Sequence, residues 1–197
     1  LGDYIVYNYL PKSTSSETYW IGGKISKGLD AWELVGTLSA SYSNSHSQML
    51  QNGILQPFRS DVFQKKLELN ARPSFWMSWN YQLSYLQNRL KSDAYESKTH
   101  HWNQKLALTF KPSNRCRLEM TGEHYLNTLA ENQTKSFVIL DADFSFQVSS
   151  KCEFTCRLIN LLNEKRYAYT LFGDLVRSYD EYRVRPFCVV VEVYYKF

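Results

Sequence analysis

Polar and apolar side chains alternate along most of the chain with a period of two residues. The alternation is clearest over residues 75–90 and 136–148. In the first stretch, one face carries Phe75, Met77, Trp79, Tyr81, Leu83 and Tyr85, and the other carries Ser78, Asn80, Gln82 and Ser84. No helical period persists for three turns. A period of two is typical of β-strands with one apolar and one polar face, so the sequence predicts an all-β fold.

The same alternation predicts about ten strands. They cover residues 3–10, 18–28, 33–43, 61–72, 75–90, 99–111, 115–126, 136–148, 152–160 and 182–197. Several are 11 to 16 residues long, whereas strands of globular sheets are most often roughly 5–6 residues long. A tilted strand needs roughly 9–11 residues to cross a bilayer. We therefore expect an antiparallel, up-and-down transmembrane β-barrel segment over residues 1–197.

The predicted connections alternate strictly between short and long. The short ones are 29–32, 72–74, 111–114 and 148–151, and the long ones are 44–60, 91–98, 127–135 and 161–181. Outer-membrane barrels have short periplasmic turns and longer extracellular loops. The pattern therefore predicts that the last strand descends from a long extracellular loop and ends in the periplasm.

Charged residues share the polar face of the predicted strands. They are Lys66, Glu68, Lys105, Arg117, Glu119, Glu123, Asp141, Asp143, Glu153, Arg157, Glu192 and Lys196. A basic residue that faces lipid at the bilayer midplane costs roughly 2–4 kcal/mol, so we expect the apolar face outside and the charged face inside. Lys65 and His124 depart from this parity, and we expect them near strand ends, where snorkelling is cheap.

The composition agrees with a barrel. Mean hydropathy is −0.44, and no apolar run approaches the roughly 20 residues of a transmembrane helix. Barrel strands face lipid only at alternate residues. Aromatic residues make up 16% of the chain, including 15 Tyr, and such side chains suit membrane interfaces. The net charge of +4 is spread along the chain, whereas a nucleic-acid surface clusters Lys and Arg, so we expect no nucleic-acid partner.

The last predicted strand is the most hydrophobic one, although chain ends are usually polar and frayed. Its apolar face carries Phe187, Val189, Val191, Val193, Tyr195 and Phe197. This pattern resembles the C-terminal signal of outer-membrane β-barrels, whose final Phe and the aromatic two residues before it are read by the barrel-assembly machinery. The resemblance implies an assembly signal at Phe197, Tyr195, Val193 and Val191. The alternative is a buried last strand of a soluble barrel or sandwich.

Candidate chemistry is sparse. His100 and His101 point to opposite faces of one strand, so they cannot jointly bind a metal from that strand alone. Asp141 and Asp143 share a face as acid–base carboxylates might, but we expect them to form salt bridges to neighbours such as Arg157 and Arg117 on adjacent strands. Cys116, Cys152, Cys156 and Cys188 lack CxxC spacing, which favours small apolar fillers over zinc or redox chemistry. We predict no catalytic residue, cofactor or metal site.

Ligand binding is the more plausible activity. The predicted loop at 164–181 is rich in aromatic residues, of which Tyr167, Tyr169, Phe172 and Tyr179 are candidate extracellular ligand contacts. Aromatic side chains suit sugars, flat rings or peptides equally, so the substrate class stays open. The alternative is that these side chains pack only against each other and the rim.

The segment 160–167, Asn-Leu-Leu-Asn-Glu-Lys-Arg-Tyr, resembles the NLxN–basic–Tyr segment that precedes the last loop and strand of TonB-dependent outer-membrane receptors. Residues 182–186 with the strand to Phe197 resemble the end of the same family, as do 26–30, Asn52-Gly53 and Pro57-Phe58 more loosely. Family members have 22 strands around an N-terminal plug. The resemblance implies the C-terminal part of such a barrel, with the plug, the TonB-contacting segment and the signal peptide lying outside this chain.

The implied function is uptake of a scarce, small nutrient across the cell outer membrane, with no covalent chemistry in this segment. The implied partners are the lipid bilayer, the barrel-assembly machinery and the TonB complex, the last through the missing N-terminal part. One alternative is a complete small barrel of about ten strands that acts as an outer-membrane enzyme or adhesin. Another is a soluble ligand-binding β-barrel.

Overall fold

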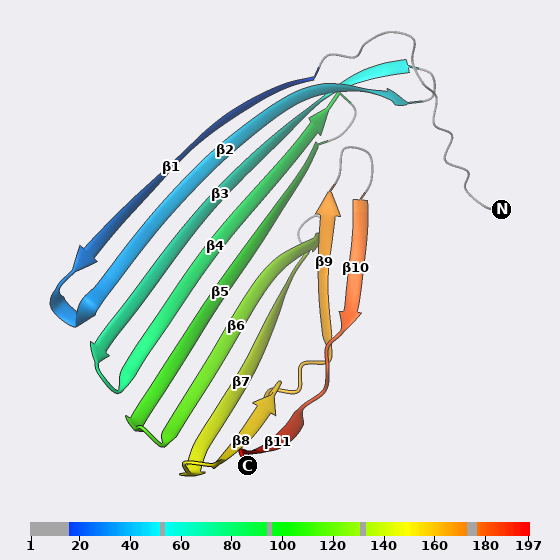
Figure 1. The fold of residues 1–197 in the computed structure, drawn as a ribbon. Helices are drawn as coiled ribbons and strands as arrows, with labels where there is room; N and C mark the ends of the chain where they lie inside the picture. Colours follow the sequence, from blue (N-terminus) through cyan, green and yellow to red (C-terminus); the bar gives the residue numbers. More distant parts are fainter. Residues whose placement is uncertain (1–15, 52–53, 94–95, 131–132, 173–176) are drawn as a thin grey trace.

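The protein forms one large antiparallel β-sheet in the computed structural model, which describes residues 16–51, 54–93, 96–130, 133–172 and 177–197 (Figure 1). The sheet contains β1 (Glu17–Leu29), β2 (Leu34–Gln51), β3 (Ile54–Ser74), β4 (Met77–Ser92), β5 (Glu96–Ser113), β6 (Cys116–Ala130), β7 (Gln133–Ser149), β8 (Cys152–Ile159) and β11 (Cys188–Tyr195). Its strand order is β1-β2-β3-β4-β5-β6-β7-β8-β11. The all-β, antiparallel prediction is confirmed. The strand predicted at 3–10 lies outside the described residues.

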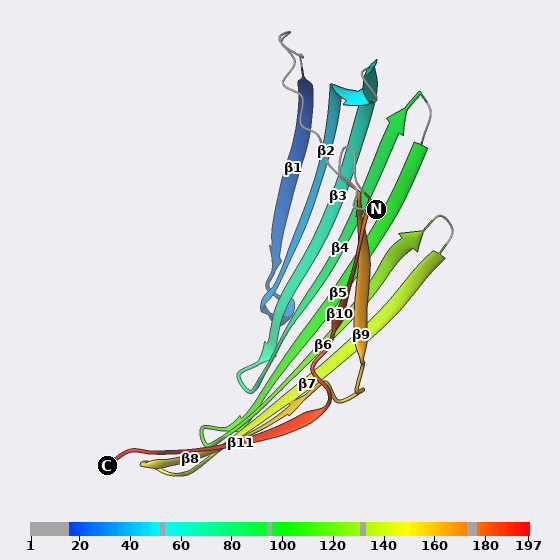
Figure 2. The ribbon, with the colours of Figure 1, turned by 90° about the vertical axis from the view of Figure 1, so that its right-hand side faces the viewer.

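Two further strands, β9 (Arg166–Phe172) and β10 (Arg177–Arg183), form a separate hairpin between β8 and β11. The sheet bends along its strands, and the hairpin stands beside it near β6 (Figures 1 and 2). A short 3-10 turn, η1 (Ala31–Glu33), connects β1 to β2. No helix among the described residues is long and apolar enough to span a membrane.

Tight turns connect the strands at or next to the four predicted short connections, but the second turn lies at Phe75 and Trp76 and not at 72–74, which belong to β3. Three predicted long loops are wrong. Backbone pairing continues to Gln51↔Ile54 between β2 and β3, to Lys91↔Glu96 between β4 and β5, and to Ala130↔Gln133 between β6 and β7. These extensions carry polar residues on both faces, so they lack the alternation that identified the other strands. The main-chain hydrogen bonds of the ladder do not depend on that alternation.

The predicted loop 161–181 and the predicted strand 182–197 also need correction. The loop contains β9 and the first part of β10. The strand is divided, because residues 184–187 belong to no strand. Pro186 lies in this break, and proline cannot donate a ladder hydrogen bond.

The sheet is open along both edges. β1 and β11 are the outermost strands and do not pair with each other in the described part of the chain, so no closed barrel is formed there. The sheet is also a single layer. In the part of the chain that the structure describes, including the separate hairpin, the buried apolar side chains are only Phe58, Ala71, Phe137 and Ala168.

Candidate functional site

The sheet has one apolar face, which the strand register makes continuous. Directly paired residues share a face, so the pairs Leu38↔Leu67↔Leu83 and Leu118↔Phe144↔Cys156↔Val191 define it across most of the strands. Many large members are exposed, among them Ile21, Ile25, Leu38, Leu106, Phe110, Val138, Phe144, Val189 and Val191. No second layer of the described structure covers this face.

Aromatic side chains lie at both limits of the apolar face. Toward the β2–β3 and β4–β5 connections, here called the hairpin end, lie Tyr42, Phe63, Tyr85 and Trp102. The ring centroids of Tyr85 and Trp102 are 4.5 Å apart, and those of Phe63 and Tyr85 are 6.5 Å apart. At the opposite limit, the turn end, Trp76 packs 5.0 Å from Phe110 in an edge-on contact, and Tyr195 packs 5.3 Å from Phe197.

The distance between the two limits follows from the number of residues between them along one strand. On β5, Trp102 and Phe110 are eight residues apart. At about 3.3 Å per residue, the separation is about 26 Å along the strand. At the tilt of roughly 35–45° that barrel strands adopt, this segment rises about 20 Å, which is close to the roughly 25 Å height of the apolar band of outer-membrane barrels.

Two polar exceptions on this face correct the sequence interpretation. Lys65 lies in the middle of β3, and not near a strand end as expected, because β3 is longer than predicted. Its ammonium lies 4.8 Å from the centroid of the Phe63 ring, toward the hairpin end. His124 lies within β6, where its Nε2 is 2.8 Å from the Ser136 hydroxyl. Both side chains therefore have a polar or aromatic neighbour that accommodates them.

The opposite face is polar and is connected by ion pairs. They are Lys66–Glu68 at 2.5 Å, Lys105–Glu123 at 2.6 Å, Arg117–Glu119, Arg157–Asp143 at 3.8 Å and Arg157–Glu192 at 3.1 Å. Ser26, Thr37 and the serines of β2 extend the polar face toward β1, where the Ser26 and Thr37 hydroxyls are 2.9 Å apart. This face can offer alternating charges and hydroxyls to water or to a polar partner.

The two aspartates singled out from the sequence have different partners. Asp143 forms the ion pair with Arg157 that the sequence suggested. Asp141 instead accepts a hydrogen bond from the backbone N–H of Asn160 at 2.7 Å, and Arg117 pairs with Glu119. These contacts favour the structural interpretation of both carboxylates over acid–base chemistry.

The histidines and cysteines are dispersed. His100 Nδ1 lies 2.7 Å from the Tyr85 hydroxyl on the apolar face, while His101 Nδ1 lies 3.2 Å from Asn127 Oδ1 on the polar face. The two rings therefore point to opposite sides, as predicted. All four cysteines are free. Within the described residues, no three His, Cys, Asp or Glu side chains gather to hold a metal.

The predicted assembly residues lie on the outermost strand and its end. Val191, Val193 and Tyr195 point to the apolar face, because Val191 pairs with Cys156 and Tyr195 with Cys152. They are 56%, 66% and 54% exposed, and Phe197 is fully exposed. Their other strand edge has no partner among the described residues. The arrangement leaves these side chains accessible, and their role as a signal stays a prediction.

The β9–β10 hairpin carries the predicted ligand contacts. Tyr167 packs 5.2 Å from both Tyr125 and Phe137 of the sheet, so it anchors the hairpin and is only partly available to a ligand. Tyr169 stacks on Tyr182 at 5.9 Å, and Tyr179 is 52% exposed. The Phe172 side chain lies outside the described part of the structure, although its backbone belongs to β9.

Tyr169 and Tyr179 of the hairpin have raised pKa values, so they remain protonated over the ordinary pH range. The hydrogen bond with the Tyr182 hydroxyl raises the pKa of Tyr169 to about 12. The Tyr179 hydroxyl donates to the Glu181 carboxylate at 2.9 Å, and this bond raises the pKa of Tyr179. Both side chains therefore present neutral phenols, with apolar rings and hydroxyl groups, to any ligand.

Two contacts that hold the hairpin were not predicted from the sequence. Asn127 of β6 is 3% exposed and donates from Nδ2 to the Ala168 carbonyl at 3.2 Å and to the Tyr167 hydroxyl at 3.3 Å. Phe137 of β7 is 1% exposed beneath Tyr167. Asn127 was assigned to a loop, and no pattern in the sequence indicated a buried amide there.

Asn160 fixes the point where the chain leaves the sheet. Its side chain donates to the carbonyls of Glu164 at 2.8 Å and Arg185 at 2.7 Å, and accepts from the Glu164 N–H at 2.9 Å. Asn160 and Asn163 both have φ of 53°, a left-handed conformation that asparagine tolerates better than most residues. The Asn-Leu-Leu-Asn segment thus joins the start of the hairpin to its return.

Comparison with protein families, with curated proteins and with solved structures finds no match to this chain.

Proposed function

We propose that this chain is a wall segment of an outer-membrane β-barrel receptor of the TonB-dependent type, which takes part in the uptake of a scarce small nutrient. The observation that carries the proposal is the single-layer sheet with an exposed apolar face, whose height is close to that of the apolar band of outer-membrane barrels. Monomeric soluble proteins rarely expose a contiguous apolar patch larger than a few hundred Å². Lipid is the solvent that suits such a face.

The distribution of charged residues also indicates which face of the sheet meets lipid. The polar face carries the five ion pairs described above, and the opposite face has Lys65 as its charged residue within the band of the described strands. A basic side chain at the bilayer midplane costs roughly 2–4 kcal/mol. Reversing the sheet would bring Lys66, Lys105, Arg117 and Arg157 into lipid, so the polar face belongs on the inner, wet side of the wall.

The open edges favour a larger barrel. In lipid, each unpaired backbone N–H or C=O costs several kcal/mol, so a spanning sheet must close. β1 and β11 both need further strands, and nine described strands would supply part of the 22 that the family resemblance implies. On this proposal, the nutrient contacts the hairpin tyrosines, and the TonB complex acts through a part of the receptor outside this chain.

Two alternatives are less well supported. A complete small barrel requires β1 and β11, or strands beyond them, to meet, and they do not pair in the described structure. A soluble ligand-binding barrel would bury its apolar face inside, whereas only four apolar side chains are buried among the described residues.

Fractionation of cells that express the intact gene tests the proposal. The protein should remain in the outer-membrane fraction after an alkaline wash, and its mobility in gels should change on heating, as expected for a folded barrel. A mass well above 23.2 kDa, that of this chain, would support the receptor. A band near 23 kDa in the same fraction would favour the small barrel, and a protein soluble without detergent would favour the soluble alternative.

A further inference from the structure

Four basic side chains form a compact block on the apolar face, just beyond its hairpin-end aromatic row. This rim block consists of Arg59 on β3, Arg89 and Lys91 on β4, and Lys98 on β5. In the register, Arg59 lies directly opposite Lys91, and Arg89 lies directly opposite Lys98. The block therefore contains two directly opposed like-charge pairs on neighbouring strands. One member of each pair also has a carboxylate on its other side, because Glu96 lies opposite Lys91 and Asp61 lies opposite Arg89.

Such pairs are unfavourable in an isolated sheet. Directly opposed side chains have Cβ atoms about 4.5–5.5 Å apart, and like charges in this position destabilise the pairing. An anion placed between them would remove the repulsion. With four basic side chains and two acidic neighbours, Asp61 and Glu96, the block keeps a net positive charge that suits an anion.

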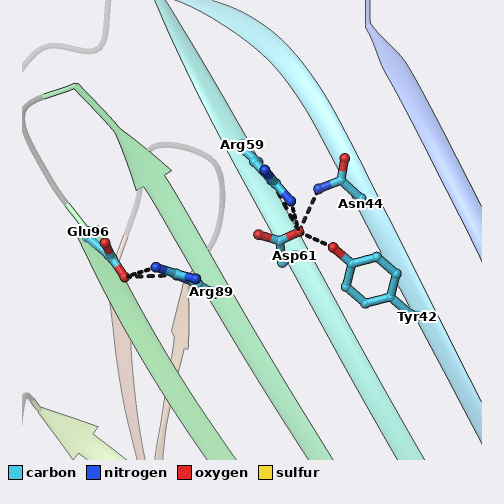
Figure 3. Close-up of polar contacts among 6 residues, drawn as sticks. All are labelled: Tyr42, Asn44, Arg59, Asp61, Arg89 and Glu96. Atoms are coloured by element: carbon cyan, nitrogen blue, oxygen red, sulfur yellow. Dashed lines mark hydrogen bonds and ion pairs between the residues drawn. The ribbon is translucent and has the colours of Figure 1, made fainter.

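Two carboxylates neutralise only part of the block. Asp61 pairs with Arg59 at 3.2 Å, and Glu96 pairs with Arg89 at 2.7 Å (Figure 3). Asp61 also accepts hydrogen bonds from the Tyr42 hydroxyl and the Asn44 amide, both at 2.5 Å, so its position is fixed (Figure 3). Neither Lys91 nor Lys98 has an ion pair with any residue that the structure describes, and both are exposed.

A pocket of about 400 Å³ adjoins the block and includes His46, Arg59 and Lys91 in its lining. Glu17 and Asp93 also line this pocket, so its charge is mixed. Glu17 lies on β1, opposite His46 and away from β5. The two arginines of the block each have an ion-paired carboxylate, so the basic side chains without one among the described residues are Lys91 and Lys98.

The position of the block along the strands indicates the depth in the membrane at which a bound anion would lie. Arg89 is four residues beyond Tyr85 on β4, and Lys98 is four residues beyond Trp102 on β5, in each case away from the apolar band. Four residues correspond to about 13 Å along a tilted strand. If the apolar band lies in the hydrocarbon core, the block lies at the depth of the lipid headgroups.

We propose that the rim block binds the phosphate groups of an anionic lipid in the outer leaflet, with the acyl chains lying along the apolar band below it. Arginine binds phosphate through parallel hydrogen bonds, and lysine contributes a point charge. Basic residues beside the hydrocarbon region attract anionic headgroups. This inference rests on the proposed membrane location.

Native mass spectrometry of the purified full-length protein in dodecyl maltoside, titrated with diphosphorylated lipid A, tests the site. The test variant is Lys91→Gln/Lys98→Gln, which leaves both arginine–carboxylate pairs intact. The control is Lys111→Gln/Lys151→Gln, with the same charge change at exposed positions near the turn end. We expect the dissociation constant for lipid A to rise at least tenfold in the test variant and to stay unchanged in the control.

A test variant that binds lipid A as tightly as the wild type, or a control that loses binding equally, would overturn the site. Inorganic phosphate at millimolar concentration should not displace the lipid. If it does, the block is a free-phosphate site and the lipid assignment is wrong. Retention in the alkaline-washed membrane is measured separately, so a membrane-embedded protein without lipid selectivity refutes only this inference, and a soluble protein refutes the proposed function as well.

Discussion

The buried side-chain amide of Asn160 holds the start and the end of the hairpin insertion together. The side chain is 1% exposed and uses both its amide nitrogen and its oxygen to hold Glu164 and Arg185, which lie 21 residues apart along the chain. Its own backbone N–H is bound by Asp141 of β7. The residue thus ties the two ends of the hairpin insertion to the sheet, and polar groups that lose such a buried partner are costly.

Replacing Asn160 by Ala should lower the free energy of unfolding by about 2–3 kcal/mol more than replacing Asn163 by Ala. Each buried group left without a partner costs about 1–3 kcal/mol. The comparison is matched, because both residues have φ of 53°. The Asn163 side chain, however, is exposed, and its Oδ1 accepts a hydrogen bond from the Phe187 N–H at 3.2 Å. Urea unfolding from bilayers measures the difference, and equal losses would show that backbone strain alone explains the asparagines.

At the scale of the strand, the face on which a residue lies should decide how strongly an introduced charge destabilises the inserted protein. Leu106→Arg places a charge on the apolar face of β5, and Ala107→Arg places the same charge on the polar face one residue later. We expect the first to destabilise the inserted protein by roughly 2–4 kcal/mol, and the second to have a much smaller effect. Comparable losses in urea unfolding from bilayers would contradict a lipid-facing apolar side.

The terminal strand permits a similar comparison. Tyr195→Asp and deletion of Phe197 should each reduce the amount of heat-modifiable, membrane-inserted protein several-fold, if these aromatic residues are the assembly signal. Tyr194→Asp is the control, because Tyr194 is on the same strand and is 67% exposed but points to the polar face. Pulse-chase labelling followed by unheated gels gives the measurement. Normal insertion of the Tyr195 and Phe197 variants would exclude the signal.

Strands could be predicted from the sequence wherever burial or lipid exposure differs between their two faces. Residues 75–90 and 136–148 are the clearest examples, and both correspond to strands in the sheet. The method fails where both faces are polar, as in the extended ends of β2 and β3, since register there comes from the main chain and not from side chains. It also fails for β9, which is stabilised by long-range contacts with Asn127 and Tyr125 that no local pattern records.

The candidate sites, too, could be predicted from the sequence only where they depend on strand periodicity alone. The parity of Val191, Val193 and Tyr195 was readable from the sequence because it depends only on strand periodicity. The rim block was not, because Arg59, Lys91 and Lys98 fell in segments assigned to loops. Their juxtaposition depends on the register of three strands, which becomes known only when the pairing of β3, β4 and β5 is known.

At the scale of the whole molecule, the difference between the two ends of the sheet predicts its orientation in the membrane. The turn end has tight connections, and the hairpin end carries the long paired extensions and the β9–β10 hairpin (Figure 1). Outer-membrane barrels place their short turns in the periplasm, so the hairpin end should face the cell exterior. That orientation would put both the hairpin tyrosines and the rim block outside the cell.

Single cysteines at the two ends decide this orientation. In a full-length protein whose four native cysteines are replaced by Ala, Asp93→Cys at the hairpin end should react with a membrane-impermeant maleimide on intact cells. Asn114→Cys in the turn between β5 and β6 should react only after lysis. Both positions are exposed, so access to the reagent and not burial determines labelling. The reverse pattern would place the hairpin tyrosines in the periplasm, and neither they nor the rim block could then act at the cell surface.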